Sequence, residues 1–563
     1  MLPAGSRSCS GRREGAGRAV VKAGCGTRLP CLRSHAPGSR PGIVAWPLCI
    51  PGTGPRTLSD KPTHWCRPTV WILLAVLAGY LLFFRTTFLV PDSSGTYAWS
   101  RSLLFDADVD FTNEFARLGS IPGDERIRFH ALSVTGRPGN PFGLGAGLLW
   151  IPFVVLAQGA SLASGLDAPA GYADLHILAA STGTVLYGLA ALLLSFAVAR
   201  RFASPAAALW AVVAGGFGTP FLAYLFHFPT YSHVPAAFAV ALVLAAALHA
   251  REGGGSGRWA LAGLAVGLAA LVRVQNVSLL AVPLALLLSR YRVDEDRRHS
   301  LRGAAALLAG ASAVFSWQLL AWWRIYGSAL ELPQGDHFLQ LSQPHLLQLL
   351  LSPWHGLFSW TPFLLLVFPG LWLLYRKDRY LALGAATALA LQTWLAASVS
   401  DWWAGYAVGA RRFVDLTPVF ILALACLFAR WRDRPGGVWG RPLVVGTALG
   451  AVLWNVLLTL QVRTGLLSPF RRVEMTEILI GQARALRELP RYLWELLSRW
   501  PFDIHLVVHR DSPVSPDFGS SPGWLLVLVL VACWALGLSL MAGAWRWAGV
   551  TARTTDWRSG RRT

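Results

Sequence analysis

The chain has 563 residues, of which 54% are hydrophobic and only 14% charged. This composition excludes a soluble globular protein and indicates a polytopic membrane protein. The formal net charge is +21, but most arginines stand in short clusters between apolar runs, as topology signals do, so nucleic acid is not expected as a partner.

The first 65 residues are rich in Arg, Gly, Pro and Ser and show no apolar periodicity. Their cysteines lack the spacing of metal ligands. This composition predicts a disordered, basic N-terminus in residues 1–65. It also leaves open whether this segment is a real part of the protein.

The apolar runs that follow have the length of membrane spans, about 20 residues each. We expect twelve spans, at 70–90, 174–199, 205–225, 232–250, 259–273, 275–290, 301–323, 356–375, 380–399, 413–430, 442–462 and 523–546. A thirteenth run, 142–164, contains Pro152 and Gln158. If it crossed, Arg200 and Arg201 would face outside, so we expect it to dip in and return, or to lie on the outer surface.

The fold class predicted is therefore an all-α polytopic membrane protein with both termini cytoplasmic and with helices lying outside the membrane. Its parts are a transmembrane domain over 66–462, an extracytoplasmic loop over 463–521, a last span over 522–546 and a cytoplasmic tail over 547–563. The loop contains an amphipathic run, Thr476 to Trp500, interrupted at Pro490.

The first outer loop, 91–141, is the densest in acidic residues near a span end. Asp92 follows the first span directly, where a charge is tolerated at the bilayer interface. Ser94 can cap a helix through Leu104 that places Tyr97 and Arg101 on one face. Asp92 is the first candidate for catalysis, although capping of this helix would also explain it.

Alternating acids follow in the same loop. Asp106, Asp108 and Asp110 resemble the start of a calcium loop, but Phe111 stands where such a loop needs Gly and Arg117 where it needs Glu. We therefore expect no metal there, and Asp110 is kept as a substrate-binding candidate.

Several cations lie on the outer face, where the positive-inside rule disfavours them. Arg273 and Gln275 occupy a very short turn between two spans. A guanidinium there suits a phosphate, although an arginine can also snorkel to the interface. His233, at the start of a span, is a further candidate, beside the structural role that such a histidine commonly has.

The 324–361 segment and the turn before the span at 413–430 hold the remaining candidates, Asp336, His355, Asp401, Trp402, Arg411 and Arg412. A tryptophan beside a carboxylate suits sugar stacking and hydroxyl binding, and paired arginines suit a phosphate. An aromatic belt with snorkelling arginines is the structural alternative. Residues 339–351 can form an amphipathic surface helix. The two histidines and two acids of this loop lack the usual metal spacing, so no metal and no cofactor is expected.

These features together resemble the GT-C superfamily of integral-membrane glycosyltransferases. The resemblance covers about 70–430 and is carried by the acid after the first span, the acidic run that follows, the Gly-Pro turn into 142–164, and the segment Asp401-Trp402-Trp403-Ala404-Gly405-Tyr406 with Arg411-Arg412. The nearest likeness is to bacterial members similar to the protein O-mannosyltransferase and aminoarabinose transferase group.

The resemblance implies a polyprenyl-phosphate-linked sugar as donor and Asp92 as the catalytic base. Many members have a second acid directly after the first, whereas here Ser93 follows. The implied partners are the lipid-linked donor, membrane lipid, and a glycan, lipid or protein acceptor, at the plasma membrane of a bacterium with the active face outside. A lipid-linked sugar flippase and a non-catalytic membrane protein of envelope assembly remain as alternatives.

Overall fold

The computed structural model describes residues 63–88, 91–118, 131–165, 170–253, 255–292, 297–433, 438–468, 471–499, 506–508 and 520–547. Predictions for residues 1–62 and 548–563, which include nearly all of the basic N-terminus and of the C-terminal tail, lie outside these ranges. In the first half of the chain the elements are α1 (Thr63–Phe83), β1 (Thr86–Phe88), α2 (Asp92–Arg101), η1 (Ser102–Asp106), α3 (Thr112–Arg117), α4 (Leu144–Ala163), α5 (Asp174–Ala199), α6 (Pro205–Phe217), α7 (Phe221–Phe226), α8 (His233–Gly253) and α9 (Ser256–Val272).

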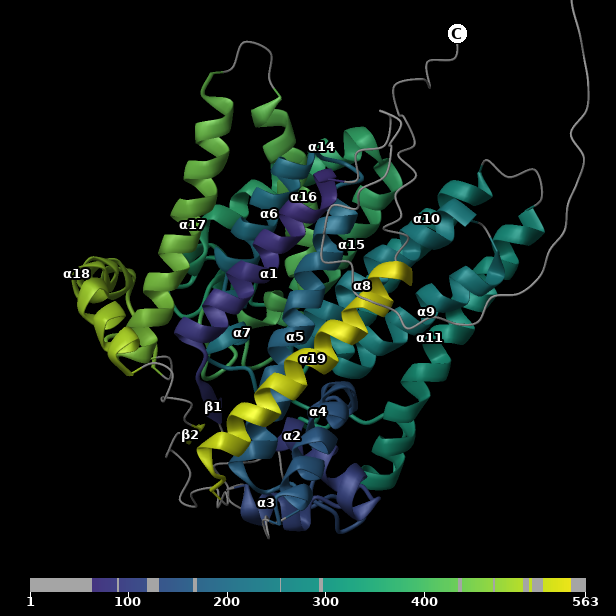
Figure 1. The fold of residues 1–563 in the computed structure, drawn as a ribbon. Coiled ribbons are helices and arrows are strands. Elements are labelled where there is room, and N and C mark those ends of the chain that lie inside the picture. Colours follow the sequence, from purple (N-terminus) through teal and green to yellow (C-terminus); the bar gives the residue numbers. More distant parts are fainter. Residues whose placement is uncertain are drawn as a thin grey trace, which may run out of the picture. The chain divides into compact units, whose positions relative to one another are not determined.

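The second half of the chain is built in the same way, from helices joined by short turns (Figure 1). Its elements are η3 (Val274–Leu280), α10 (Ala281–Tyr291), α11 (Arg297–Tyr326), α12 (Leu346–Leu351), α13 (Leu357–Trp360), η4 (Pro362–Leu366), α14 (Val367–Lys377), α15 (Arg379–Ala397), η5 (Arg411–Leu416), α16 (Thr417–Arg432), α17 (Gly440–Arg463), α18 (Met475–Arg499), β2 (Leu506–Val508) and α19 (Gly523–Trp547).

The described residues contain nine helices long and apolar enough to cross a membrane, together with three shorter apolar helices at Pro68–Phe83, Pro205–Phe217 and Ser256–Val272. The chain is therefore an all-α, multi-pass membrane protein, as its composition predicts. The number of twelve spans stays a prediction, because length and composition do not decide whether each helix crosses.

Three helices, α5, α8 and α16, form the centre of the bundle. Their apolar windows are 89%, 83% and 94% buried, whereas those of α11 and α19 are 22% and 28% buried. A helix that is apolar on every side has to face either protein or lipid. The central helices face protein, and α11 and α19, which lies across the front of the view in Figure 1, face lipid.

Helix α4 lies where the predicted re-entrant run was placed. Its first residue donates a backbone N–H to Gln318 Oε1 near the end of α11, at 2.9 Å, and Gln158 near its other end contacts His176 Nε2 in the first turn of α5, also at 2.9 Å. The predicted topology puts the end of α11 and the start of α5 on the same side. α4 is one continuous helix that is long and apolar enough to span a membrane, so its return to the outer side stays a prediction.

Close packing of α9 against α11 depends on glycine. A Cβ at Gly267 would lie 2.6 Å from the carbonyl oxygen of Ala311, and one at Gly263 would overlap the carbonyl oxygen of Leu307. Small residues four apart allow helix backbones to approach in this way within a membrane. This pair of helices sets the position of Arg273, which follows α9 directly.

Two local predictions were wrong. Ser94 is not a cap, because α2 already begins at Asp92 and the Ser94 hydroxyl donates to the carbonyl of Pro91, at 3.1 Å. The helix does extend through Leu104 as predicted, but as a π-helical turn over Ser102–Asp106. In the 339–351 run only α12, Leu346–Leu351, is helical. The amphipathic run of the long loop is confirmed as α18, with Pro490 inside it.

A short parallel pairing was not expected. β1 follows α1, and its Thr86 and Phe88 pair with Leu506 and Val508 of β2. The two strands are separated by more than 400 residues of sequence, so no local pattern could show that they meet. The pairing ties the end of α1, directly before Asp92, to the loop that precedes α19 (Figure 1).

Candidate active site

Asp92 is the first residue of α2, and the backbone around it is fixed by hydroxyl groups. The Thr96 hydroxyl donates to the carbonyl of Asp92 at 2.7 Å. The hydroxyls of Ser93 and Thr230 lie 2.7 Å apart, and Thr230 donates to the carbonyl of Thr87 at 2.8 Å. The start of α2 is thus held between β1 and the segment that precedes α8.

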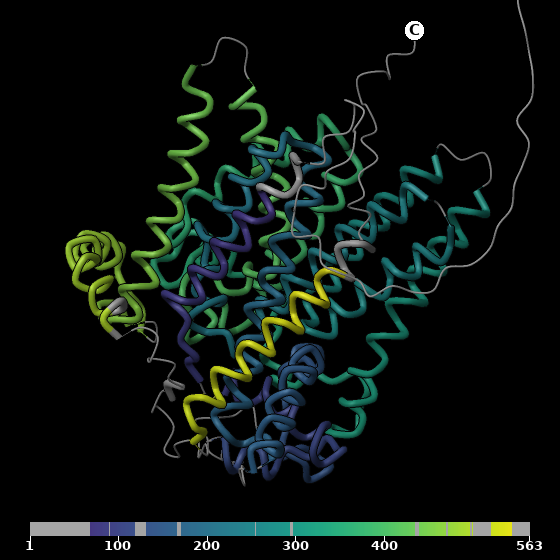
Figure 2. Tube along the Cα trace, viewed as in Figure 1, coloured from purple at the N-terminus to yellow at the C-terminus, as the bar shows by residue number. Residues whose placement is uncertain are grey.

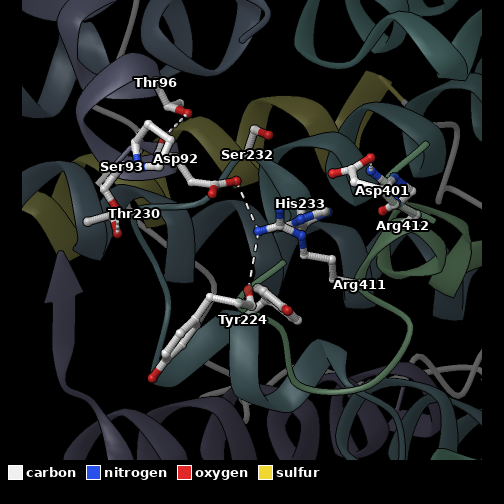
Figure 3. Close-up of polar contacts among 12 residues, drawn as sticks. Asp92, Ser93, Thr96, Tyr224, Thr230, Ser232, His233, Asp401, Arg411 and Arg412 are labelled. Carbon is white, nitrogen blue, oxygen red and sulfur yellow. Dashed lines mark hydrogen bonds and ion pairs between the residues drawn. The ribbon is translucent and has the colours of Figure 1, made fainter. Parts of the chain in front are cut away.

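The carboxylate of Asp92 forms an ion pair with Arg411, the first residue of η5, which is distant in the sequence. Arg411 Nη1 lies 2.9 Å from Asp92 Oδ1, and the two side chains are 12% and 21% exposed. Figure 3 shows the two groups pointing toward each other. The Asp92 carboxylate can therefore be reached from outside the protein, unlike that of Asp415, which is fully buried.

The ring of Tyr231 packs against the guanidinium of Arg411. The guanidinium carbon lies 5.2 Å from the centre of the Tyr231 ring, which also stacks on the imidazole of His233 at 5.9 Å. Burial raises the pKa of Tyr231 well above its usual value, so its phenol stays protonated. The ring face is thus a fixed, electron-rich support for the cation.

Asp415 lies at the centre of a second cluster and is fully buried. Arg273 Nε lies 2.9 Å from its Oδ2, His233 Nδ1 lies 3.2 Å from its Oδ1, and Gln275 Nε2 donates to Oδ2 at 3.4 Å. Arg273 Nη1 also donates to Ser232 Oγ at 3.2 Å. Three sequence candidates are thus brought together by an acid that was not among them.

The sequence did contain one signal for Asp415. An acid at the start of an apolar run, with no acidic neighbour, is costly in a membrane protein unless a partner neutralises it. Arg273, in its short turn, is that partner. The pairing could have been proposed from the sequence, but two other arginines stand much closer to Asp415 in the chain.

Arg412 holds the turn after Asp401. Its Nη2 lies 2.7 Å from Asp401 Oδ1, and its Nη1 donates to the carbonyls of Asp401 and Trp402 at 2.7 and 3.1 Å. The turn then passes through Ala404, whose φ of 65° is rare for a residue other than glycine. Arg412 therefore fixes a strained turn as well as adding charge.

His355 and three tryptophans form a cluster beside this turn. Trp354 stacks on Trp403 at 4.4 Å and meets Trp402 edge-on at 6.0 Å. His355 Nδ1 lies 2.8 Å from the carbonyl of Trp403. Burial lowers the pKa of His355 to about 4, so the ring is neutral and its Nδ1–H donates to that carbonyl. Its buried Nε2, a hydrogen-bond acceptor, has no partner among the described residues.

Four candidates lie away from the pair of Asp92 and Arg411. Tyr97 donates to the carbonyl of Gly171 at 2.8 Å, and Arg101 pairs with buried Glu114 at 2.9 Å and with Asp106. Asp110 accepts from the backbone N–H and the hydroxyl of Thr112, at 3.1 and 2.6 Å, at the start of α3. Asp336 is exposed. The first three hold the outer loop together.

The acids of the outer loop are used in the same way. Asp108 accepts from the Ser102 hydroxyl at 2.8 Å, while Asp106 serves Arg101 and Asn113. In the part of the chain that the structure describes, no three residues of the types His, Cys, Asp and Glu gather as a metal site.

Three arginines converge on this region. The guanidinium groups of Arg273, Arg411 and Arg412 all lie within electrostatic range of the His233 ring. Each has an acidic partner. Arg273 pairs with the fully buried Asp415, Arg412 pairs with Asp401 of the strained turn, and Arg411 pairs with the partly exposed Asp92. The arrangement can accept a proton at Asp92 and stabilise an anion at Arg411.

No protein-family model and no curated protein matches the chain. Solved structures similar to it include ArnT from Cupriavidus metallidurans bound to undecaprenyl phosphate, with 16% identity, a TM-score of 0.41 and 78% of each chain covered. The apo state of ArnT gives 17% identity and a TM-score of 0.40, over 78% of this chain and 77% of that one.

Arabinosyltransferase EmbB from Mycobacterium smegmatis is also similar, with 14% identity and a TM-score of 0.38, over 80% of this chain and 43% of EmbB. At these TM-scores the overlap of the chains is too loose to assign an activity. The activity has to be judged from the residues of this chain.

Proposed function

We propose that this protein is a membrane glycosyltransferase that moves a sugar from a polyprenyl-phosphate donor to an acceptor hydroxyl on the extracytoplasmic face, with inversion. The observation that supports this most is the ion pair of Asp92 and Arg411, which sets a partly exposed base beside a cation. Such a transfer needs both, because a proton leaves the acceptor while negative charge grows on the leaving phosphate.

The chemistry can be written with these two groups. The acceptor oxygen attacks the anomeric carbon, and the bond from that carbon to the phosphate oxygen breaks on the opposite face. Asp92 takes the hydroxyl proton, since a carboxylate can accept on one oxygen while the other stays paired. The lipid phosphate leaves with the electron pair of the broken bond, and Arg411 stabilises its charge.

The surrounding residues keep this arrangement in place. Tyr231 supports Arg411 from one side, and the buried cluster of Asp415 with Arg273 and His233 lies next to it. Arg273 adds positive potential while its own charge is balanced by Asp415. The donor phosphate would therefore be drawn toward Arg411, whose acidic partner is about to gain a proton.

The tryptophan cluster, to which His355 is hydrogen-bonded at the carbonyl of Trp403, offers flat surfaces for a sugar ring. We assign this cluster to binding of the transferred sugar or of a glycan acceptor, as the sequence pattern around Asp401 and Trp402 suggests.

The test is a comparison of donors. Membranes containing the full chain are incubated with radiolabelled sugars carried on polyprenyl phosphate or on a nucleotide, and the anomeric configuration of the product is read by NMR. We expect transfer from the prenyl donor only, with inversion. Transfer from the nucleotide donor, or retention, would contradict the proposal, and a chain inactive with every donor would favour the flippase or the non-catalytic alternative.

A further inference from the structure

The surface of α18 has three different faces. Ile478, Gln482 and Ala485 are buried, and Gln482 Nε2 donates to the carbonyl of Trp454 on α17 at 3.2 Å. Leu479 and Trp494 lie on a second, apolar face and are 50% and 73% exposed. The third face is charged and lies opposite Leu479 on the helix, with Arg484, Glu488 and Arg491.

A helix with exposed apolar and charged faces on opposite sides typically lies in the plane of a membrane surface. Figures 1 and 2 show α18 crosswise to α17, which has the length and composition of a span. The exposed apolar face therefore suits contact with acyl chains, and the charged face suits headgroups and water. This also explains why a helix of 25 residues carries so much uncovered apolar surface.

A pocket lies beneath α18, where the helix meets the bundle. Its cavity volume is about 20 Å³, roughly the space of one water molecule, and its walls come from α1, α7, α17 and α18. The lining is almost wholly apolar, with Phe83, Leu222, Phe226 and Leu460 among its residues.

Arg463 brings a positive charge to this apolar lining, at the last residue of α17. Its Nη1 donates to the carbonyl of Phe83 at 3.0 Å, and its guanidinium lies 5.3 Å from the Tyr492 ring of α18. The guanidinium is thus held between three of the four walls. Residues 463–499 hold seven arginines and four glutamates, a balance of +3, which attracts anionic lipid.

We infer that α18 and the pocket beneath it bind an anionic phospholipid of the surrounding bilayer. The end of one acyl chain enters the open mouth of the pocket between α1, α7 and α17, and the phosphate lies at Arg463. The exposed apolar face of α18 packs against neighbouring chains of the same leaflet. This binding is independent of the proposed glycosyl transfer, since neither Asp92 nor Arg411 lines the pocket.

The test uses the full chain in nanodiscs of equal parts phosphatidylglycerol and phosphatidylcholine, released and weighed by native mass spectrometry. We expect the wild type to retain more phosphatidylglycerol than phosphatidylcholine. Arg463→Gln should lower its retention about tenfold, the loss expected for one charge-assisted hydrogen bond. Arg463→Lys should largely keep it, and Leu460→Trp should displace both lipids. For comparison, Arg484→Gln removes an exposed charge on α18 away from the pocket and should lower the retention of phosphatidylglycerol much less than Arg463→Gln.

Size-exclusion chromatography identifies variants that fail to fold. If Leu460→Trp fails to fold, Val456→Phe is used instead, because its larger side chain fills the same pocket. Equal retention by the wild type and by both pocket variants would overturn the site. Equal retention of the two lipids by the wild type would overturn the role of Arg463. If added undecaprenyl phosphate replaces phosphatidylglycerol on the wild type but not on Leu460→Trp, the occupant is a prenyl lipid and the assignment to bilayer phospholipid is wrong.

Discussion

Removing the carboxylate of Asp415 should destabilise the protein through Arg273. Asp415 is fully buried and lies 2.9 Å from Arg273 Nε and 3.2 Å from His233 Nδ1. In Asp415→Ala the arginine keeps its charge but loses its counter-charge. Breaking one partner of a buried pair costs about 3–5 kcal/mol. Because Arg273 is 18% exposed and can still reach water, we expect about 2–3 kcal/mol.

A double-mutant cycle separates this effect from the loss of packing. Asp415→Ala, Arg273→Gln and the double variant are unfolded by SDS in mixed micelles, and their free energies of unfolding are compared with the wild type. We expect a coupling energy of about 2 kcal/mol. The pair of Asp401 and Arg412 is the control, and because 29% of the Asp401 side chain is exposed, we expect a coupling below about 1 kcal/mol.

The reasoning would be refuted if the effects of Asp415→Ala and Arg273→Gln simply added. Arg273 would then be adequately solvated without its partner. The same result would remove the argument that Asp415 keeps Arg273 in position beside the proposed phosphate.

Three further predictions concern the outer loop, the cation and the helix packing. Burial raises the pKa of Glu114 to about 7, so the folded loop holds this proton more tightly than the unfolded loop does. The hydrogen-exchange protection of α3 should therefore fall by up to about 3 kcal/mol as the pH rises from 4.5 to 7. Glu114→Gln should abolish this pH dependence. Arg411→Gln should lower kcat/KM for the lipid donor by about 10²–10³ while thermal unfolding shows a folded protein, and an unchanged kcat/KM would exclude Arg411 from phosphate binding. Gly267→Ala should cost about 1–3 kcal/mol in unfolding, because its Cβ would lie 2.6 Å from the Ala311 carbonyl, whereas Gly257→Ala, which meets nothing within 4 Å, should be neutral.

The sequence predicted the long apolar helices because runs of apolar residues of that length indicate them directly. It also predicted that Asp92, His233, Arg273 and Arg411 lie in one region, since polar residues at the ends of adjacent spans gather in one layer. The amphipathic α18 followed from its periodicity. Each of these features is a property of a single segment of the sequence, so it can be predicted without knowing how the segments pack.

The pairing between segments could not be predicted. Tyr97 and Arg101 do lie on the same helix, but buried Glu114 and Gly171 decide where their side chains go. Each arginine of the site had several acids that it could have joined. The choice of Asp415 for Arg273 depends on how closely α9 and η5 approach α8, which is a matter of packing.

The measurement that tests the account most directly is sugar transfer from polyprenyl-phosphate donors by the wild type and by Asp92→Asn, in membranes at matched expression. Asparagine keeps the shape of the side chain but cannot take the proton, so we predict that the transfer rate falls by about 10²–10⁴. Asp92→Glu should keep part of the rate. Transfer by Asp92→Asn at the wild-type rate would contradict the account and move the base to another acid.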